Sequence, residues 1–523
     1  MDWERDGENI KNFKEPQTGK LLSRPQNTEF YFYPGLTWSD RTTRLFSVRP
    51  LPGGAIFSVK GSAGFFTGEE LYVLGIMNSL LFNGFLSLLV GAGDAAARSY
   101  QVGVIGTVPF VEHGIDNSEN YELLKKLTST AINIKRTLDT TNEISHVFQL
   151  PTILQVMRDT LIERIDAWRR QVVKTEQQLD ELQDKIDDIA FHLYDIEDRD
   201  RQTLGELLRQ GKKVVDDKLG DDTEDNNEFE VSLDAQRLVT DLVSYTVGCI
   251  FGRWDIRLAT GELSMPQLPD PFAPLPVCSP GMLTNDDGLP QRETPSEYPL
   301  EINWEDIVVD DHDHQDDIVD RAQEVLRVIW QDRAESIEQE ACQILGVKEL
   351  REYFRRPGNG GFWMDHVRRY SKSRRKAPIY WLLQSPKKNY ALWLYYHRLD
   401  KDTLFKALTK YVEPKIHLED SRLEQWRAQL AAAGSEGREV KQLERQLERQ
   451  ESLVAELYDF RDKLRRAADL NLEPDLNDGV VLNIAPLREL VPWSEAKKYW
   501  DELLAGKYEW SSISKQLRSK GVI

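Results

Sequence analysis

The chain is poor in cysteine and lacks the sequence motifs of common nucleotide-binding and hydrolytic enzymes. Its 523 residues include three cysteines, which lie far apart and lack the paired spacing of a zinc site or a disulfide framework. No Walker A loop, Gly-x-Ser-x-Gly elbow or HExxH motif occurs in the sequence. We therefore expect no catalytic residue and no metal ligand in this chain, and a reducing, cytoplasmic location.

Long hydrophobic runs are absent as well. The N-terminal residues show no basic segment followed by an apolar stretch, and the longest apolar run, around Leu80 to Val90, is too short and too interrupted to cross a bilayer. We expect no membrane partner and no export. Basic residues are outnumbered, because 67 Lys and Arg face 87 Asp and Glu, for a net charge of -20. This balance excludes a uniformly basic nucleic-acid surface but not a local one.

The composition is typical of a globular protein with several domains, since 40% of the residues are hydrophobic and 29% are charged. From Phe30 to about Phe110, predicted short strands broken by Pro and Gly enclose one helical segment that begins near Thr67. We therefore predict an α+β, multidomain fold with a β-rich first domain.

Helical periodicity and glycine interruptions divide the rest of the chain. Apolar residues from Leu179 to Leu193 follow a heptad seam, which favours an intramolecular helical spacer and leaves a partner helix as the alternative. Gly434 and Gly437 interrupt two helical stretches and predict an antiparallel hairpin. The predicted domains are an α+β domain at 1–150, a helical spacer at 151–213, an acidic linker at 214–235, a mixed basic and aromatic domain at 236–416, an antiparallel coiled-coil hairpin at 417–466 and a C-terminal tail at 467–523.

The densest basic cluster lies within the mixed domain. Basic side chains neutralise phosphates and release counterions, so this cluster predicts contact with double-stranded DNA, although a solvated rim around buried strands is the alternative. The interleaved aromatic residues, such as Tyr380 and Trp393, are more typical of the core of the domain. The predicted DNA-binding residues here are Arg355, Arg356, Arg368, Arg369, Lys372, Arg374, Arg375, Lys376, Lys387 and Lys388.

An acidic run from Asp310 to Asp317, with two histidines, has the residue types of a metal site. A linear polar run of this kind is more typical of a solvated loop or of a helix N-terminus, where carboxylates favour the positive end of the helix dipole. We therefore expect no metal there.

Several blocks of the sequence resemble one family. They include "SRPQNTEFYFYPGLTWS", "GEELYVLGIMNSLLFNGFL", "YQVGVIGTVPF", "YTVGCIFGRWD" and "RRKAPIYWLLQSPKKNYALWLYYHR". Together they resemble the target-recognition region of the large adenine-specific DNA methyltransferases of bacterial phage-defence islands, the BREX (PglX-type) and DISARM classes. These enzymes are similar to type II restriction-modification methylases. The resemblance extends over nearly the whole chain.

The resemblance implies a division of labour between recognition and catalysis. In that family an N-terminal Rossmann-like domain carries the S-adenosylmethionine pocket and a catalytic Asn-Pro-Pro-Tyr tetrad. The nearest match in this chain is Asp270-Pro271-Phe272, which lacks the second proline and the tyrosine. We therefore expect the recognition half alone, not an enzyme by itself, with S-adenosylmethionine on a separate methyltransferase subunit or a missing N-terminal domain. The alternative is a non-catalytic scaffold that binds other phage-defence proteins through its helical hairpins.

Within this resemblance, one polar loop of the first domain suits base recognition. Arginine donates two hydrogen bonds to guanine in the major groove, and Ser, Thr and Asp contact other base edges or phosphates. A polar hairpin without a ligand is the alternative. The predicted DNA-binding residues of this region are Ser39, Asp40, Arg41, Thr42, Thr43 and Arg44, with Lys60 and Ser62 holding the backbone nearby.

Overall fold

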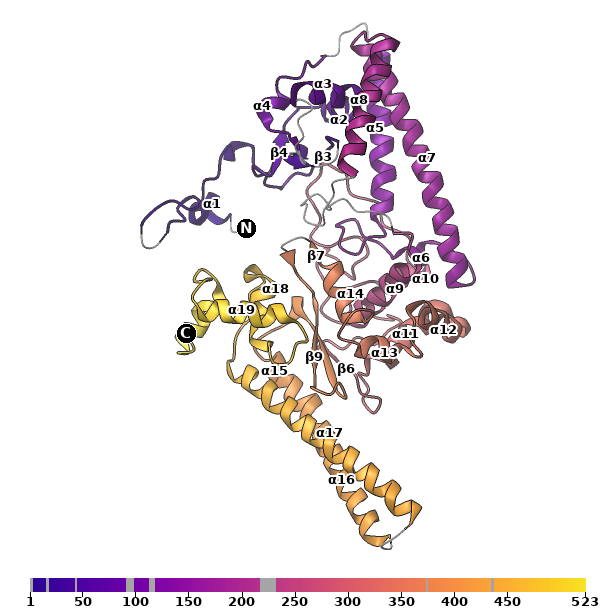
Figure 1. The fold of residues 1–523 in the computed structure, drawn as a ribbon, viewed down its shortest axis with the longest axis vertical. Coiled ribbons are helices and arrows are strands. Elements are labelled where there is room, and N and C mark those ends of the chain that lie inside the picture. The colour runs from indigo at the N-terminus through magenta and orange to yellow at the C-terminus, as the bar shows by residue number, and fades with distance from the viewer. Residues whose placement is uncertain are drawn as a thin grey trace. The chain divides into compact units, whose positions relative to one another are not determined.

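The chain divides into two compact units (Figure 1). The computed structural model describes residues 3–15, 18–42, 45–90, 98–111, 118–216, 232–372, 375–433 and 437–523. The first unit comprises residues 1–149, 166–231 and 266–280, and the second comprises residues 150–165, 232–265 and 281–523. Most of the predicted acidic linker at 214–235 lies outside the described residues.

Helices dominate both units. The chain is 55% helix and 8% strand, so the α+β class is confirmed but the predicted β-rich character of the first domain is wrong. The segment predicted to be its last strand forms only the two-residue strand β5 (Arg98–Ser99) and the short helix α4 (Val102–Ile105). The Pro- and Gly-rich stretches are largely irregular backbone.

Among the described residues, the first unit contains the two-residue strand pair β2–β5 and a small three-stranded antiparallel sheet covered by helices. Its strands lie in the order β3-β1-β4, and Trp38 of β1 packs with Phe46 and Leu81 in the core. The elements are α1 (Glu4–Lys11), β1 (Gly35–Ser39), β2 (Arg41–Thr42), β3 (Val48–Leu51), β4 (Gly61–Gly64), α2 (Glu70–Met77), α3 (Leu80–Val90), β5, α4, α5 (Ser118–Asp139), most of α7 (Leu161–Leu193) and α8 (Asp198–Asp216).

The helical segment predicted to begin near Thr67 forms two helices, α2 and α3, bent by 63°. The break is stabilised by Asn78, whose side-chain amide donates to the carbonyl of Leu74 and whose side-chain oxygen accepts from the backbone N–H of Val48. In the described part of the chain no single helix is long and apolar enough to cross a membrane; this bent pair passes by length and composition only. Tyr72 and Leu81 of the pair are buried in the core.

Helix α7 packs its heptad seam inside the chain. Ile186 and Ile189 belong to the core of the first unit, so this part of the seam has an intramolecular partner. Beside them Asp187 is buried, and its carboxylate accepts a hydrogen bond from the backbone N–H of Leu80 at 2.7 Å. This bond fixes the first turn of α3 to α7, because the N–H groups of a first helical turn have no partner within the helix.

Asp187 should make the stability of the first unit depend on pH. Burial raises its pKa from 3.8 to about 6, although the bonds from Leu80 and Gln183 oppose the rise. The contribution of protonated Asp187 to the free energy of unfolding is therefore fully present below pH 3.8. About 3 kcal/mol of it is lost as the pH rises through 6. The D187N variant keeps the acceptor without the charge. Urea unfolding at pH 4 and pH 7 should show the variant gaining stability over the parent chain at pH 7; an unchanged difference would contradict this.

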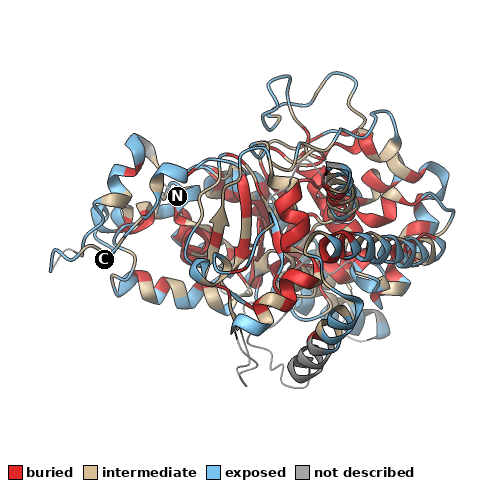
Figure 2. Cartoon of the chain, turned by 90° about the horizontal axis from the view of Figure 1, so that it is seen from above, coloured by how far each residue is buried: buried red, intermediate tan, exposed pale blue. Residues whose placement is uncertain are grey.

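The second unit is built around a buried three-stranded antiparallel sheet in the order β6-β10-β9. Every residue of the three strands is buried. Figure 2 shows buried residues gathered in the interior and exposed residues along the outer faces of the long helices. The elements are α6 (Thr152–Gln155), α9 (Ala235–Ile250), α10 (Ile256–Thr260), β6 (Ile307–Val309), α11 (Ile318–Trp330), α12 (Ala334–Leu345), α13 (Leu350–Arg355), α14 (Phe362–Arg369), β7 (Ser371–Lys372), β8 (Arg375–Lys376), β9 (Tyr380–Gln384), β10 (Ala391–Tyr395), α15 (Thr403–Lys406), α16 (Glu413–Ala432), α17 (Arg438–Asp469), α18 (Val480–Ile484), α19 (Ser494–Leu504) and α20 (Ser512–Ser519).

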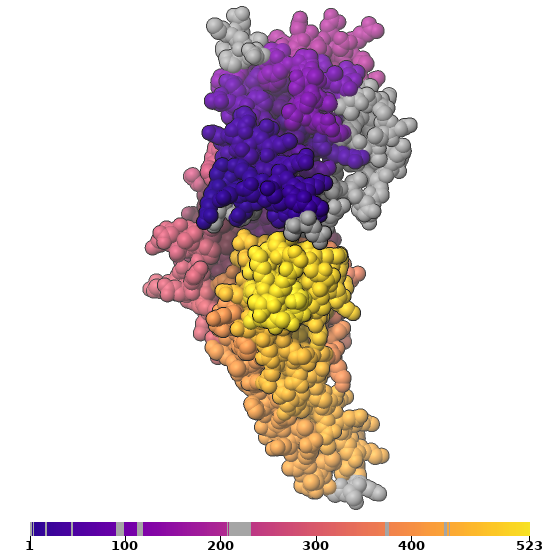
Figure 3. Space-filling view, turned by 90° about the vertical axis from the view of Figure 1, so that its left-hand side faces the viewer, coloured from indigo at the N-terminus to yellow at the C-terminus, as the bar shows by residue number. Residues whose placement is uncertain are grey.

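Helices α16 and α17 form the predicted antiparallel hairpin, which projects from the rest of the second unit (Figure 1). Three contacts in reverse order confirm the direction: Glu413 pairs with Arg465 at 2.6 Å, Asp420 accepts from Tyr458 at 2.7 Å, and Arg427 pairs with Glu451 at 2.9 Å. Glu419 also accepts from Gln450 at 2.7 Å. Figure 3 shows the C-terminal residues, in yellow, as a compact lobe beside the base of the hairpin. The predicted interruption falls between the helices, where residues 434–436 lie outside the described residues.

The acidic run forms a buried ion-pair network at the edge of the sheet. Arg351 of α13 is 3% exposed and pairs with Asp310 and, at 2.8 Å, with Asp317. Asp317 also caps α11, accepting from the N–H of Val319 and of Asp320 at 3.0 Å. The helix N-terminus interpretation is therefore confirmed, but the prediction of a solvated loop is wrong for Asp310 and Asp317, which are 2% and 0% exposed. Burial raises the pKa of Asp317, but bonds from Arg351 bring it below its usual value.

Removing Arg351 should destabilise the second unit strongly. The R351M variant leaves buried Asp317 without its counter-charge and leaves Asp310 with Arg355 alone, which costs about 3–5 kcal/mol. R333M is the matched control, because Arg333 pairs with Asp159 at the surface, where a pair contributes less than about 1 kcal/mol. Urea unfolding measures both. Adding D310N and D317N to R351M should recover part of the loss; an R351M loss no larger than that of R333M would contradict the network's role.

Candidate nucleic-acid interface

The predicted recognition loop of the first unit is pinned to its neighbours. Asp40 lies between β1 and β2, and its backbone N–H donates to the carbonyl of Lys60 at 3.1 Å. Its carbonyl accepts from the N–H of Tyr100 at 2.6 Å. Asp40 is thereby held from two sides by segments distant in the sequence. Thr43 and Arg44, also predicted to contact DNA, lie outside the described residues.

Two of the predicted DNA-binding hydroxyl groups are buried. Thr42 is 9% exposed and Ser62 is 7% exposed. The carbonyl of Ser62 accepts a hydrogen bond from the hydroxyl of Thr37 at 2.9 Å, across the β1–β4 pairing. We therefore assign Thr42 and Ser62 a role in holding this part of the fold, since contact with DNA would require them to be uncovered.

The remaining polar residues of this region are linked by the Asp40–Lys60 backbone bond and an Arg49–Ser39 contact, and Ser39 and Asp40 are half-buried. We call these five residues the β1 patch: Ser39, Asp40, Arg41, Arg49 and Lys60. Arg41, Arg49 and Lys60 are exposed. Arg49 was missed by the sequence interpretation, yet its guanidinium donates to the hydroxyl of Ser39 at 3.3 Å. The alternation of buried Val48 and exposed Arg49 in β3 is the signal that could have found it, because successive side chains in a strand point to opposite faces.

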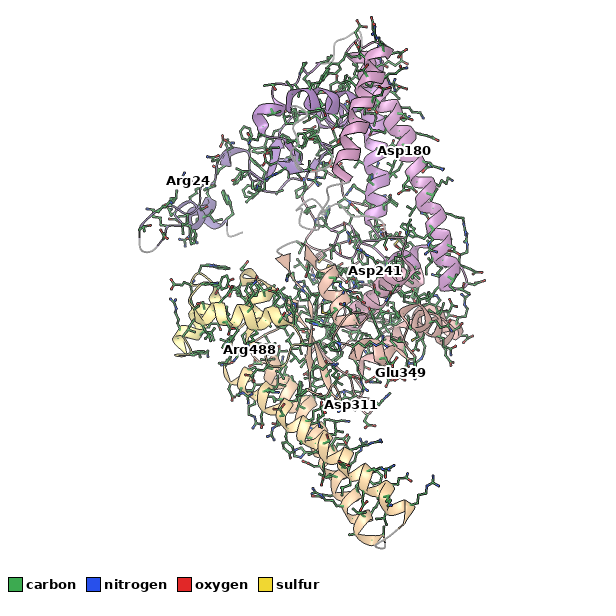
Figure 4. All side chains as sticks on the ribbon, in the orientation of Figure 1. Arg24, Asp180, Asp241, Asp311, Glu349 and Arg488 are labelled. Carbon is green, nitrogen blue, oxygen red and sulfur yellow. The ribbon has the colours of Figure 1, made fainter. Side chains whose placement is uncertain are left out.

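In the second unit, three of the predicted DNA-binding residues are held in ion pairs of the fold. Arg355 pairs with buried Asp310. Arg369 is 10% exposed and pairs at 2.6 Å with Asp241 of α9, which is labelled in Figure 4. Lys376 pairs with Glu495 of α19 at 2.6 Å. Acidic residues of the same chain neutralise these three charges. Part of the positive charge of the cluster therefore stabilises the fold and does not add to the net charge of the surface.

The other predicted basic residues are more accessible. Arg356 and Arg368 are paired with acids three or four positions away at 3.6 and 3.2 Å, and their side chains are 42% and 55% exposed. Lys387 and Lys388 are exposed in the turn between β9 and β10. Surface pairs of this kind contribute little to stability and can exchange their partner for a phosphate. We call Arg356, Arg368, Lys387 and Lys388 the unit-2 patch.

The hairpin of β7 and β8 carries the rest of the predicted cluster. Lys372 pairs with Arg375 in the backbone register of the two strands. Ser373 and Arg374, which follow Lys372 in the sequence, lie outside the described residues. The interleaved aromatic residues are core, as predicted: Tyr380, Trp381, Tyr390 and Trp393 are each 0–1% exposed.

The three cysteines are part of the packed interior. Cys249, Cys278 and Cys342 are buried and form no disulfide. Across the described ranges, no group of three or more His, Cys, Asp or Glu side chains is arranged to hold a metal ion. At the residues nearest to a methyltransferase tetrad, the Asp270 carboxylate accepts from the backbone N–H of Phe272 at 2.8 Å and closes its own turn.

Comparison with known proteins places the chain among distant relatives of one class. No model of a known protein family matches the chain. Over about nine-tenths of its length, however, the chain shows distant homology to adenine-specific methyltransferases of BREX systems.

Two relatives carry this similarity. The adenine-specific methyltransferase BrxX of Escherichia coli O9:H4 (strain HS) is 25% identical over 489 residues, which cover 89% of this chain. The adenine-specific methyltransferase PglX of Lacticaseibacillus casei (strain Zhang) is 23% identical over 502 residues, which cover 93%. The chain spans 37% of the length of each relative.

Charge reversal at two adjacent arginines should separate fold from binding. R369E places a carboxylate against Asp241 in a nearly buried pair and should lower the thermal midpoint by several degrees, whereas R368E changes an exposed side chain and should leave it unchanged. Differential scanning calorimetry measures this. The charge swap R369D with D241R should restore part of the stability. Equal midpoints for R368E and R369E would contradict a structural role for Arg369.

Proposed function

We propose that this chain is the DNA-recognition part of an S-adenosylmethionine-dependent adenine-N6 DNA methyltransferase of bacterial phage defence. It holds duplex DNA and selects the sequence for a catalytic domain outside the matched segment. The observation that carries the proposal is a similarity to two adenine-specific methyltransferases that extends over about nine-tenths of this chain. The matched segment makes up 37% of the length of each of those proteins. A segment shared as a block is consistent with a separate task within a larger enzyme.

The charged surfaces support a division between positioning and sequence selection. The β1 patch combines two arginines with the hydroxyl of Ser39 and the carboxylate of Asp40, which supply both donors and acceptors for base edges. The unit-2 patch offers mainly Lys and Arg, which suit phosphates. We propose that the first selects the sequence and the second contributes affinity that is independent of sequence.

Binding and labelling experiments test this proposal. The purified chain should bind duplex DNA, and the logarithm of its affinity should fall with the logarithm of salt by about 0.9 per phosphate contact. Incubated with labelled S-adenosylmethionine and DNA, the chain alone should transfer no methyl group. The absence of duplex binding would overturn the recognition role, and label in adenine would overturn the proposed separation of catalysis.

A second candidate function is a non-catalytic scaffold that binds other defence proteins. The observation that favours it is the projecting α16–α17 hairpin, whose outer half exposes side chains such as Glu424 and Arg445. Replacing residues 424–448 with a short Gly-Ser linker keeps Glu419 and Gln450 at the hairpin base. Loss of co-purifying proteins from the native host, with DNA binding unchanged, would favour the scaffold; loss of neither would exclude the hairpin as its docking element.

Arg41 should control which sequence is methylated more than how tightly DNA is held. A bidentate contact from arginine to guanine contributes about 1–3 kcal/mol of discrimination, whereas one phosphate contact among many affects all sequences alike. With the methyltransferase activity reconstituted, R41A should relax or shift the motif found by genome-wide sequencing of methylated adenines. R368A should lower methylation uniformly. An unchanged motif at normal activity in R41A would remove Arg41 from the recognition surface.

A further inference from the structure

A tight turn beside the β1 patch presents an apolar side chain to solvent. The backbone N–H of Ser58 donates to the carbonyl of Gly61 at 3.2 Å, and the N–H of Gly61 donates to the carbonyl of Ser58 at 3.0 Å. This pair of bonds leaves Val59 and Lys60 at the tip. Val59 is 77% exposed, although valine is among the residues most often buried in proteins.

The sequence of this turn departs from what a two-residue hairpin turn favours. Such turns prefer Gly, Asn or Asp, because these residues tolerate a positive φ. Neither Val59 nor Lys60 has a positive φ, so this turn has another backbone conformation. The turn is instead supported by the hydroxyl of Ser58, which accepts from the backbone N–H of Lys60 at 3.3 Å. An exposed β-branched residue adds no burial here. Departures from local rules without a gain for folding are expected at functional positions.

A basic residue adjoins the apolar tip. The carbonyl of Lys60 accepts from the N–H of Asp40, so the turn is joined to the β1 patch directly before Arg41. Lys60 itself is exposed at the tip. An exposed apolar side chain next to an exposed lysine matches duplex DNA, whose phosphates attract the cation and whose stacked bases offer an apolar interior to a side chain that separates them.

We propose that Val59 is a wedge that inserts between adjacent base pairs of the DNA held by the β1 patch, while Lys60 contacts a flanking phosphate. This inference rests on the proposed DNA-recognition function and adds a second source of selectivity. Partial unstacking costs least at flexible pyrimidine–purine steps. Val59 therefore selects for deformable steps, without any hydrogen bond to a base.

Permanganate oxidation of unstacked thymines tests the wedge whatever motif the chain recognises. Fragments of the host genome are incubated with the full chain, oxidised and sequenced. The parent chain should increase thymine reactivity at pyrimidine–purine steps, and V59S should lose this increase. V59I, which keeps the apolar bulk, should retain it. K60A should also retain it but reduce the salt dependence of binding by about one phosphate contact. V173S, at a half-exposed valine on α7, is the matched control and should behave as the parent chain.

The outcomes separate this inference from the function on which it rests. A chain that binds duplex DNA but gives no reactivity above free DNA overturns the wedge and leaves the recognition function standing. V59S with the reactivity of the parent chain does the same. If the chain binds no duplex DNA, this result contradicts both the recognition function and the proposed wedge.

Discussion

The second unit depends on one buried cation. Arg351 joins Asp310, at the end of β6, to Asp317, the cap of α11, so a single guanidinium fixes a strand, a helix start and its own helix α13. The network continues to the hairpin, because Asp311, labelled in Figure 4, pairs with Lys415 of α16 at 2.7 Å. Two carboxylates this deeply buried are tolerated because counter-charges are held in place, Arg351 for both and Arg355 for Asp310 as well. The orientation of the hairpin base is therefore tied to the sheet by electrostatics as well as by apolar packing.

Ion pairing within the chain also explains why the role of the basic cluster could be predicted only in part from the sequence. Its aromatic residues were correctly assigned to the core, since the continuous apolar runs of β9 and β10 are typical of strands buried on both faces. The ion pairs could not be anticipated, because Arg369 and Asp241 are 128 positions apart and only the folded chain brings them together. Counting basic residues in a window overstates the charge that reaches the surface.

Local signals predicted helices and the hairpin better than strands. Glycines and apolar spacing located α16 and α17, because those signals act over a few residues. The β-rich prediction for the first unit was wrong because Pro- and Gly-broken segments have the composition of short strands, whereas pairing requires a partner that local sequence does not specify. Arg41 and Lys60 were predicted as DNA-binding by residue type and stay predictions, whereas the exposure of Arg49 follows from the alternation of β3, which was not recognised as a strand.

The hairpin base has a mechanical consequence. Glu456 of α17 accepts from the Ser385 hydroxyl at 2.6 Å, from the Lys387 N–H at 2.7 Å and from the Asn389 side chain at 2.6 Å, so it clasps the turn between β9 and β10. Between this contact and the start of α17, residues 438–455 extend for about 27 Å toward the hairpin tip. The hairpin is thus anchored at the central sheet, and a force applied at its tip would act on the turn that carries Lys387 and Lys388.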